Sequence, residues 1–144
     1  MAASVRDVMT ENPRSIGVSA SAVEAARLMR DEDIGSLPVT DGEALVGMIT
    51  DRDIATRVVA EAADPQGTSV GDVCSRDVIS VAPDEDLDDA LRLMGRHQVR
   101  RLTVIEDGRL VGIVAQADVA LRENETTTGQ LVEAISAPSA GART

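Results

Sequence analysis

Short apolar stretches recur along the chain at spacings that favour β-strands. Residues 15–18 and 79–81 each form one such stretch, and residues 37–39 and 102–105 form another. Runs of this length, bounded by Gly, Pro, Asp and Ser, are typical of strands. The sequence therefore predicts the same pair of strands in each half of the chain.

Two longer segments lie between these strands and have the period of an amphipathic helix. Apolar residues recur at helical spacing over residues 22–31 and 87–97. Ser21 and Glu24 have the spacing of a capping box, in which two side chains satisfy free amides at a helix start. The carboxylates of residues 83–89 suit the start of the second helix, where the helix dipole is positive.

An Asp-Gly pair follows the later strand of each half, and this pair is a strong signal for a β-hairpin. The hairpin predicts a returning strand, at 45–50 and at 110–115. A helix is expected next, at 52–60 and at 117–122. The predicted order in each half is thus β-α-β-β-α, preceded by a short helical turn at 4–9 or 69–74.

The two halves are copies of one unit. Shifting the sequence by 65 residues aligns residues 5–57 with residues 70–122 without a gap, and 16 of the 53 pairs are identical. The most similar stretches are LVGMITDRDI, which begins at Leu45, and LVGIVAQADV, which begins at Leu110. A match over the whole unit indicates a tandem repeat.

A unit of about 60 residues buries little apolar surface alone. We therefore expect an α+β fold in which two units pack sheet to sheet about a pseudo-twofold axis, with a cleft between them. The first unit is expected over residues 1–65 and the second over 66–127. Residues 128–144 are expected to form a short C-terminal helix, near 130–136, and a flexible tail.

Composition excludes several classes of function. The chain has no Phe, Tyr or Trp, and its net charge of −11 combines 25 acidic residues with 14 arginines and no lysine. Without aromatic stacking and with this charge, nucleic-acid binding is disfavoured. No apolar run is long enough to span a membrane, and no secretory signal is evident. A single cysteine suits a reducing cytoplasm, and one cysteine with one histidine disfavours a closed zinc site.

The repeated unit resembles a CBS domain. The resemblance rests on the β-α-β-β-α order, on IGSLPV after the long helix, and on LVGMITDRDI leading into the last helix. Two such units in tandem resemble a Bateman module, a regulatory pair that binds adenosine-containing ligands. HQVRRLTV and LVEAISAP further resemble small stand-alone two-CBS proteins of actinobacteria. The resemblance implies no required cofactor, with AMP, ADP or ATP as the ligand.

Thr50 and Asp53 stand at the junction between a predicted strand and the helix after it. Their spacing indicates a capping pair, with the Thr hydroxyl at the helix start and Asp53 in the first turn. The resemblance adds a second role, in which Asp53 accepts hydrogen bonds from both ribose hydroxyls and Thr50 faces a phosphate. In the second unit Asp118 is kept while Ala115 replaces the threonine. We therefore expect tighter binding at the Thr50 site, with inheritance from a duplicated ancestor as the alternative explanation of Asp118.

Arginines near the second site could compensate for the missing hydroxyl, because arginine binds phosphate in a bidentate manner. The candidates there are Arg96, Arg100 and Arg101, and Arg52, beside Thr50 at the first site, is a further candidate. Pairing with nearby carboxylates at the surface is the alternative. The aliphatic residues expected to clamp adenine are Ile16, Leu37, Val81 and Leu102.

Two other residues have simpler interpretations. His97 is expected to interact with the dipole at a helix end. Cys74 occupies the place of Met9 in the first unit and is expected to be a packing residue, with a redox role as the alternative.

Three functions compete on this sequence. The first is a non-enzymatic sensor that binds a nucleotide and signals to a regulated protein. The second is an interaction or scaffold module that has lost its ligand, which Ala115 favours. The third is an enzyme, for which no Ser-His-Asp set, metal-ligand cluster or Gly-rich phosphate loop is present. The resemblance and the apolar helices further predict a homodimer.

Overall fold

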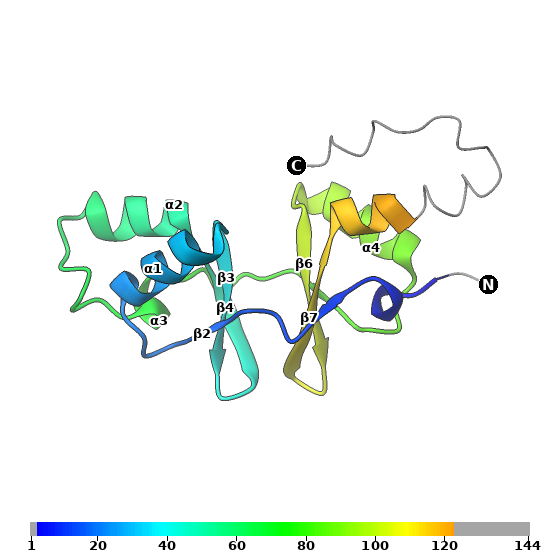
Figure 1. Ribbon diagram of the computed structural model, residues 1–144, viewed down its shortest axis with the longest axis horizontal. Coiled ribbons are helices and arrows are strands. Elements are labelled where there is room, and N and C mark those ends of the chain that lie inside the picture. The colour runs from blue at the N-terminus through cyan, green and yellow to red at the C-terminus, as the bar shows by residue number, and fades with distance from the viewer. Residues whose placement is uncertain (1–2, 123–144) are drawn as a thin grey trace. The chain divides into compact units, whose positions relative to one another are not determined.

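A computed structural model describes residues 3–122 of the chain. The short helix and tail expected at residues 128–144 lie outside the described residues. Figure 1 shows helices and strands in the predicted order, and the α+β fold class is confirmed. Each predicted element that the structure describes ends within two residues of its expected bounds.

The first repeat supplies η1 (Val5–Asp7), β1 (Thr10–Glu11), β2 (Ile16–Gly17), α1 (Ala22–Glu32), β3 (Ser36–Asp41), β4 (Ala44–Thr50), α2 (Asp51–Ile54) and the π-helical turn η2 (Ala55–Val59). The second supplies α3 (Val70–Val73), β5 (Ser80–Val81), α4 (Leu87–His97), β6 (Arg101–Glu106) and β7 (Arg109–Ala115). Residues 116–122 are helical. Strand β1 is the one element among them that the sequence analysis did not predict.

Local capping explains where the long helices begin. The Glu24 amide donates to Ser21 Oγ over 3.1 Å, and the Ser21 amide donates to Glu24 Oε2 over 3.2 Å. The predicted capping box is therefore confirmed. Both long helices end in a left-handed residue other than glycine, at Asp33 with φ 57° and at Gln98 with φ 56°.

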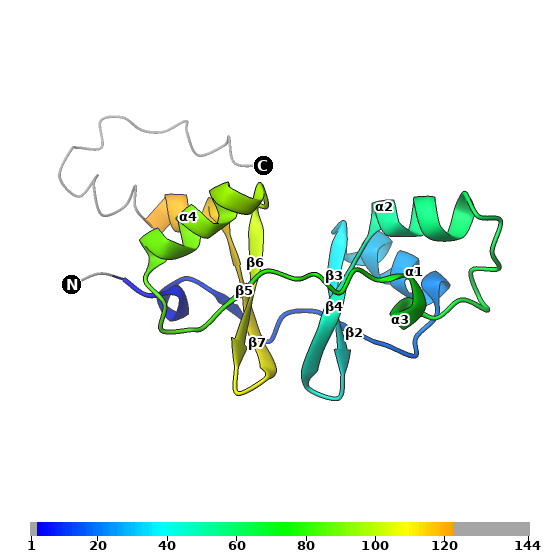
Figure 2. The same ribbon diagram turned by 180° about the vertical axis from the view of Figure 1, so that it is seen from behind.

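Each long helix connects two parallel strands. Strand β2 pairs with β3 through Ile16 and Val39, and α1 is the connection between them. Strand β5 pairs with β6 in the same way and lies beside it in Figure 2, with α4 as the connection. Strand β3 returns antiparallel as β4, with Leu37 opposite Ile49. Helices α1 and α2 lie on one side of this hairpin (Figure 1).

The compact units of the fold do not coincide with the sequence repeats. One unit, called here the β4 unit, comprises Asn12–Ile79 and Ile105–Leu110. Of the described residues, the other unit, called the β7 unit, comprises 3–11, Ser80–Val104 and 111–122. Each unit therefore contains the opening segment of the other repeat. The division of the repeats at residue 65 and the packing of the units stay predictions.

In each unit, the glycine of the repeated LVG sequence leaves room for the opening segment of the other repeat, which is called here the exchanged segment. Within the β4 unit, Ser75 and Met48 exchange two backbone hydrogen bonds of 2.8 Å. A Cβ atom on Gly47 would lie 2.4 Å from the Ser75 carbonyl oxygen. Within the β7 unit, β1 pairs antiparallel with β7, and a Cβ on Gly112 would lie 2.9 Å from the Thr10 oxygen. Close backbone approach therefore explains why both repeats keep this glycine.

The core of the β4 unit is aliphatic, as expected from the absence of aromatic residues. Helix α1 contributes Ala22, Ala25 and Met29, and it packs on β-strand residues such as Leu37 and Ile49. Among the described residues no helix is both long and apolar enough to cross a membrane.

Candidate functional site at two strand-to-helix junctions

The first junction joins β4 to α2 at Thr50. The Asp53 amide donates to Thr50 Oγ1 over 3.0 Å, and the Thr50 amide donates to Asp53 Oδ2 over 2.9 Å. This reciprocal pair is a complete capping box, so the capping interpretation of Thr50 and Asp53 is confirmed. The hydroxyl hydrogen of Thr50 is not used by this pair, since Thr50 Oγ1 is the acceptor.

One oxygen of the Asp53 carboxylate accepts a hydrogen bond within the capping box, and the carboxylate can still accept others. Its Oδ2 accepts from the Thr50 amide, while Oδ1 lies 3.8 Å from Nε of Arg57. The Asp53 side chain is 14% exposed. A carboxylate has about four acceptor positions, so this geometry permits further hydrogen bonds from a ligand diol.

The second junction joins β7 to helical residues 116–122. Ala115 occupies the place of Thr50, so no hydroxyl caps this helix, and Asp118 lies in its first turn. The Gln116 amide donates to the Arg100 carbonyl over 2.7 Å. Arg100 is exposed and is thereby fixed at the start of the helix that carries Asp118.

Electrostatics distinguish the two junctions. At the first, the Asp51 amide donates to the Gly35 carbonyl over 2.9 Å, which places an acidic residue at the helix start. At the second, Gln116 and Arg100 occupy the corresponding places. The first junction therefore carries more negative charge than the second, a difference that a phosphate would experience directly.

The expected adenine clamps are core residues in this structure. Ile16 is 8% exposed and Leu37 is fully buried in the β4 unit. Val81 is 5% exposed and Leu102 is 1% exposed in the β7 unit. Each pair lies on neighbouring parallel strands, but the side chains are buried in the core. Contact with adenine through these residues stays a prediction.

The remaining candidates are placed as follows. Arg101 is the exposed first residue of β6, Arg52 is exposed in α2, and Arg96 and His97 form the basic last turn of α4. Cys74 is 7% exposed and belongs to the core cluster, which confirms its packing role. Its Sγ lies 3.8 Å from the Gly71 carbonyl oxygen.

Sequence reasoning missed Arg57. Its Nη1 donates to the Val73 carbonyl over 3.0 Å and to the Cys74 carbonyl over 3.4 Å, while Nε faces Asp53. The signal was present, because Arg57 and Arg122 are an identical pair between the repeats and follow Asp53 and Asp118 at the same spacing.

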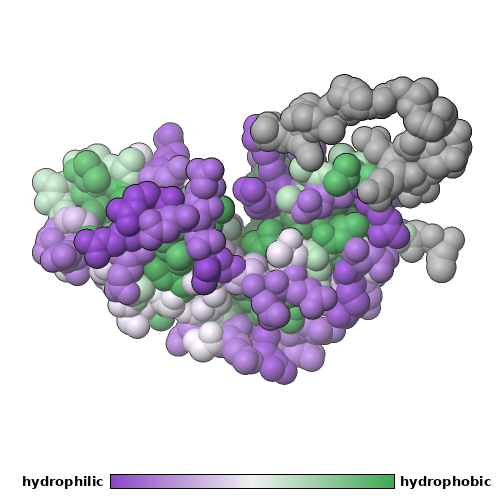
Figure 3. Space-filling model, in the orientation of Figure 1, coloured by the Kyte–Doolittle hydropathy of each residue, from purple (hydrophilic) through white to green (hydrophobic). Residues whose placement is uncertain are grey.

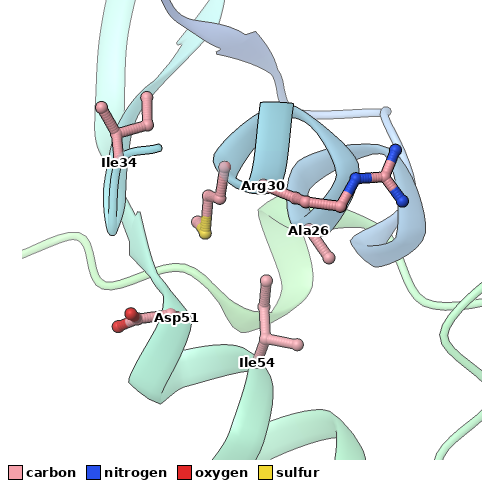
Figure 4. A pocket seen from close by; sticks show the side chains of 6 residues that line it. Ala26, Arg30, Ile34, Asp51 and Ile54 are labelled. Carbon is pink, nitrogen blue, oxygen red and sulfur yellow. The ribbon is translucent and has the colours of Figure 1, made fainter. Parts of the chain in front are cut away.

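A pocket of about 310 Å³ opens between α1 and α2 in the β4 unit. Figure 4 shows Arg30 and Asp51 on opposite sides of it, with the apolar side chains of Ala26, Ile34 and Ile54 around the space. Arg30 donates to Asp31 over 2.8 Å, and this hydrogen bond lowers the pKa of the Asp31 carboxyl. The pocket is thus mainly apolar, with charges at its rim.

The family model of the CBS domain matches the chain twice, at residues 5–60 and 70–124. The chain belongs to the CBS domain family. It is a tandem CBS pair, as the repeated strand and helix order indicated, and the predicted resemblance is confirmed.

Two comparisons place this CBS pair among stand-alone proteins. Hypoxic response protein 1 of Mycobacterium tuberculosis is 38% identical over 94% of this chain and 95% of its own. A crystal structure of Hypoxic Response Protein I with two coordinated zinc ions has a TM-score of 0.77, at 36% identity over 83% of this chain and 98% of that one. Within residues 3–122 of the present chain, no group of three or more His, Cys, Asp or Glu residues could hold a metal ion.

A third comparison concerns ligands. The CBS domain pair of protein MJ0100, solved in complex with 5′-methylthioadenosine and S-adenosyl-L-methionine, has a TM-score of 0.71 at 28% identity. The alignment covers 88% of this chain and 99% of that one. Some CBS pairs of this fold thus bind adenosine-containing molecules, and the present chain is a regulatory module of the same class.

Proposed function

We propose that this CBS pair is a non-enzymatic sensor that binds an adenosine-containing nucleotide at its strand-to-helix junctions. The observation that carries the proposal is the Asp53 carboxylate, which is fixed by the Thr50 amide and keeps acceptor positions for a ribose diol. Asp118 recurs at the corresponding place of the second junction. The MJ0100 complex supports an adenosine-containing ligand.

Binding acts on the sensor by shifting a conformational equilibrium. A ligand favours one arrangement of the protein only by its difference in affinity between two arrangements. Thr50 and Asp53 stabilise the start of α2, and a ligand held by both residues would stabilise that helix further. We propose that a regulated protein in the cytoplasm recognises the stabilised form.

The absence of aromatic residues makes this proposal simple to test. A chain without Trp, Tyr or Phe absorbs little at 260 or 280 nm, so bound adenine would dominate its spectrum. We expect gel filtration at a fixed level of AMP, ADP or ATP to carry a 260 nm band with the protein. At a ligand concentration 100-fold above Kd, linkage adds about 2.7 kcal/mol of stability, which raises the melting temperature by several degrees.

Matched ligands and variants give the control. CMP carries the same phosphate charge as AMP without adenine, and an Asp53→Ala and Asp118→Ala double variant removes both ribose acceptors. Neither CMP with the wild-type chain nor AMP with the double variant should produce the 260 nm band or the thermal shift. If no adenosine ligand at millimolar concentration produces either signal in the wild-type chain, the sensor proposal is wrong. The second function, a CBS-fold interaction module without a ligand, would then remain, consistent with Ala115 and the buried clamp residues.

We also propose that the sensor is a homodimer. Val59 at the end of η2 is 69% exposed, and an exposed apolar patch around such a residue often marks an interaction surface. Figure 3 shows hydrophobic atoms gathered over the outer end of the α2–η2 helix. The apolar pocket between α1 and α2 adds to this surface. A second copy of the chain would cover these features symmetrically.

Sedimentation at micromolar concentration should therefore give twice the mass of one chain. Val59→Asp should shift the protein toward monomer, because it places a charge in the proposed interface without disturbing the core. Val59→Thr, which is nearly the same size, should associate with intermediate strength. A wild-type monomer at high concentration would refute the dimer.

A further inference from the structure

Arg57 is the one side chain in the described β4 unit shown to contact both the candidate ribose acceptor and the exchanged segment. Its Nε lies 3.8 Å from Asp53 Oδ1, and its Nη1 donates to the carbonyls of Val73 and Cys74 over 3.0 and 3.4 Å. Those carbonyls lie at the end of α3, where the helix leaves acceptors without helical partners. A guanidinium with five donors can serve both groups at once.

The segment that Arg57 holds is the one that the second repeat contributes to the β4 unit. Its other attachments are the burial of Val70, Val73 and Cys74 in the core cluster and backbone hydrogen bonds. Val70 donates to Ala20 over 2.8 Å, and Ser75 exchanges two bonds with Met48 over 2.8 Å. Met48 lies in β4, two residues before Thr50. Arg57 therefore connects Asp53 to residues 73–75. These residues are bonded to β4, and β4 leads directly to the junction at Thr50.

The repeat gives independent support. Among the 53 aligned pairs, arginine is kept at two positions, and Arg57 with Arg122 is one of them. Both follow the repeated aspartate by four residues, a spacing that places the two side chains on one face of a helix. An arginine needed merely for surface charge would not have to keep this relation to the aspartate.

We propose that Arg57 is a positioning residue that orients the Asp53 carboxylate and couples its occupancy to the attachment of residues 70–75. The proposal rests on the proposed nucleotide site for its ligand. Ribose hydroxyls that donate to Asp53 reduce the attraction of the carboxylate for Arg57, and the arginine then binds the Val73 and Cys74 carbonyls more strongly. The exchanged segment would thus become more firmly attached when the site is filled, and this change can be read by a partner.

The first arm of the test needs no nucleotide. Hydrogen exchange at the Ser75 amide reports opening of the segment, because this amide donates to Met48. Arg57→Gln should speed this exchange about fivefold, and Asp53→Asn should slow it about two- to threefold, because Arg57 then binds the carbonyls more strongly. Asn keeps an oxygen for the Thr50 amide and removes only the charge. The double variant should match Arg57→Gln, because Asp53 acts on the segment through Arg57.

The second arm measures nucleotide binding by calorimetry and Ser75 exchange with AMP present. We expect Arg57→Gln to weaken AMP binding at the first junction about tenfold and to abolish the protection that AMP gives Ser75. Arg57→Lys should restore part of the affinity through its charge, but not the protection, since an ammonium cannot reach both groups. Arg76→Gln is the matched control, because Arg76 donates to the Gly71 carbonyl over 3.0 Å in the same segment. It should leave nucleotide affinity unchanged.

The outcomes separate this inference from the proposed function. If the wild-type chain binds AMP and Arg57→Gln binds it equally well, the positioning role is wrong while the sensor stands. If the wild-type chain binds no nucleotide, the sensor and the coupling to occupancy both fail. The first arm then decides whether Arg57 links Asp53 to the segment, and independent, additive effects of Arg57→Gln and Asp53→Asn would overturn that link.

Discussion

Gly47→Ala is expected to lower the free energy of unfolding by about 3 kcal/mol, a large effect for the addition of one methyl group. The new Cβ would lie 2.4 Å from the Ser75 carbonyl oxygen and 3.2 Å from Cys74 Sγ. The first neighbour is backbone and cannot rotate away. The segment must therefore move, with strain of about 1–3 kcal/mol and loss of up to two backbone bonds worth about 1 kcal/mol each.

Two further glycines make this prediction specific. Gly112→Ala should be destabilising but cost less, because its backbone neighbour, the Thr10 oxygen, would lie 2.9 Å from the Cβ rather than 2.4 Å, and the nearest atom, Met9 Sδ at 2.7 Å, belongs to a flexible side chain. Gly95→Ala in α4 has no atom within 4 Å and should stabilise the protein by about 0.5–1 kcal/mol. Urea unfolding followed by circular dichroism at 222 nm measures all three, since the chain has no aromatic fluorescence. Equal changes in unfolding free energy for the Gly47 and Gly95 variants would contradict the close approach of the Ser75 carbonyl to Gly47.

Asp118→Ala is expected to weaken ATP binding by tenfold or more, and Asp53→Ala to weaken it less. For adenosine, which lacks phosphates, the order is expected to reverse. A phosphate at the first junction would lie near the carboxylate of Asp51 as well as the guanidinium of Arg52, whereas at the second it would lie near Arg100, with Gln116 in the place of Asp51. At an effective dielectric constant near 20, one such charge difference is worth on the order of 2 kcal/mol. Adenosine escapes this repulsion, and its ribose hydroxyls meet the Asp53 carboxylate that the Thr50 amide holds in place.

Calorimetry with ATP and with adenosine on both variants checks this reversal. Asp89→Ala provides the control, because it changes the net charge equally at an exposed position paired with Arg92. The sequence alone favoured the Thr50 site for adenosine nucleotides, since it compared the Thr50 hydroxyl with Ala115 and did not weigh Asp51. If Asp53→Ala removes more ATP binding than Asp118→Ala, the hydroxyl outweighs the charges and the earlier expectation holds.

Local sequence signals predicted the elements of the fold well. The Ser21 and Glu24 capping box, the bounds of α4 and the Thr50 cap each depend on residues within one helical turn of one another. Such interactions are visible in the sequence because their spacing is fixed by helix geometry. The gapless repeat then transferred each prediction from one half to the other.

Contacts between distant segments were not predictable in the same way. Strand β1 has two residues, too few for an alternating pattern, and its partner β7 lies about 100 residues away. The helix ends at Asp33 and Gln98 use left-handed residues other than glycine, so the usual stop signal was missing. Arg57 was overlooked because its carbonyl partners belong to the other repeat.

The exchange of opening segments bears on how this chain arose. One repeat alone lacks the segment that lies over its own LVG glycine, because that segment comes from the other repeat. An ancestor with a single repeat would complete its fold as a domain-swapped dimer, in which each chain places its opening segment on the other. Gene duplication then converts an exchange between two chains into one within a chain. Afterwards the two halves are free to diverge, and Thr50 and Ala115 are one record of that divergence.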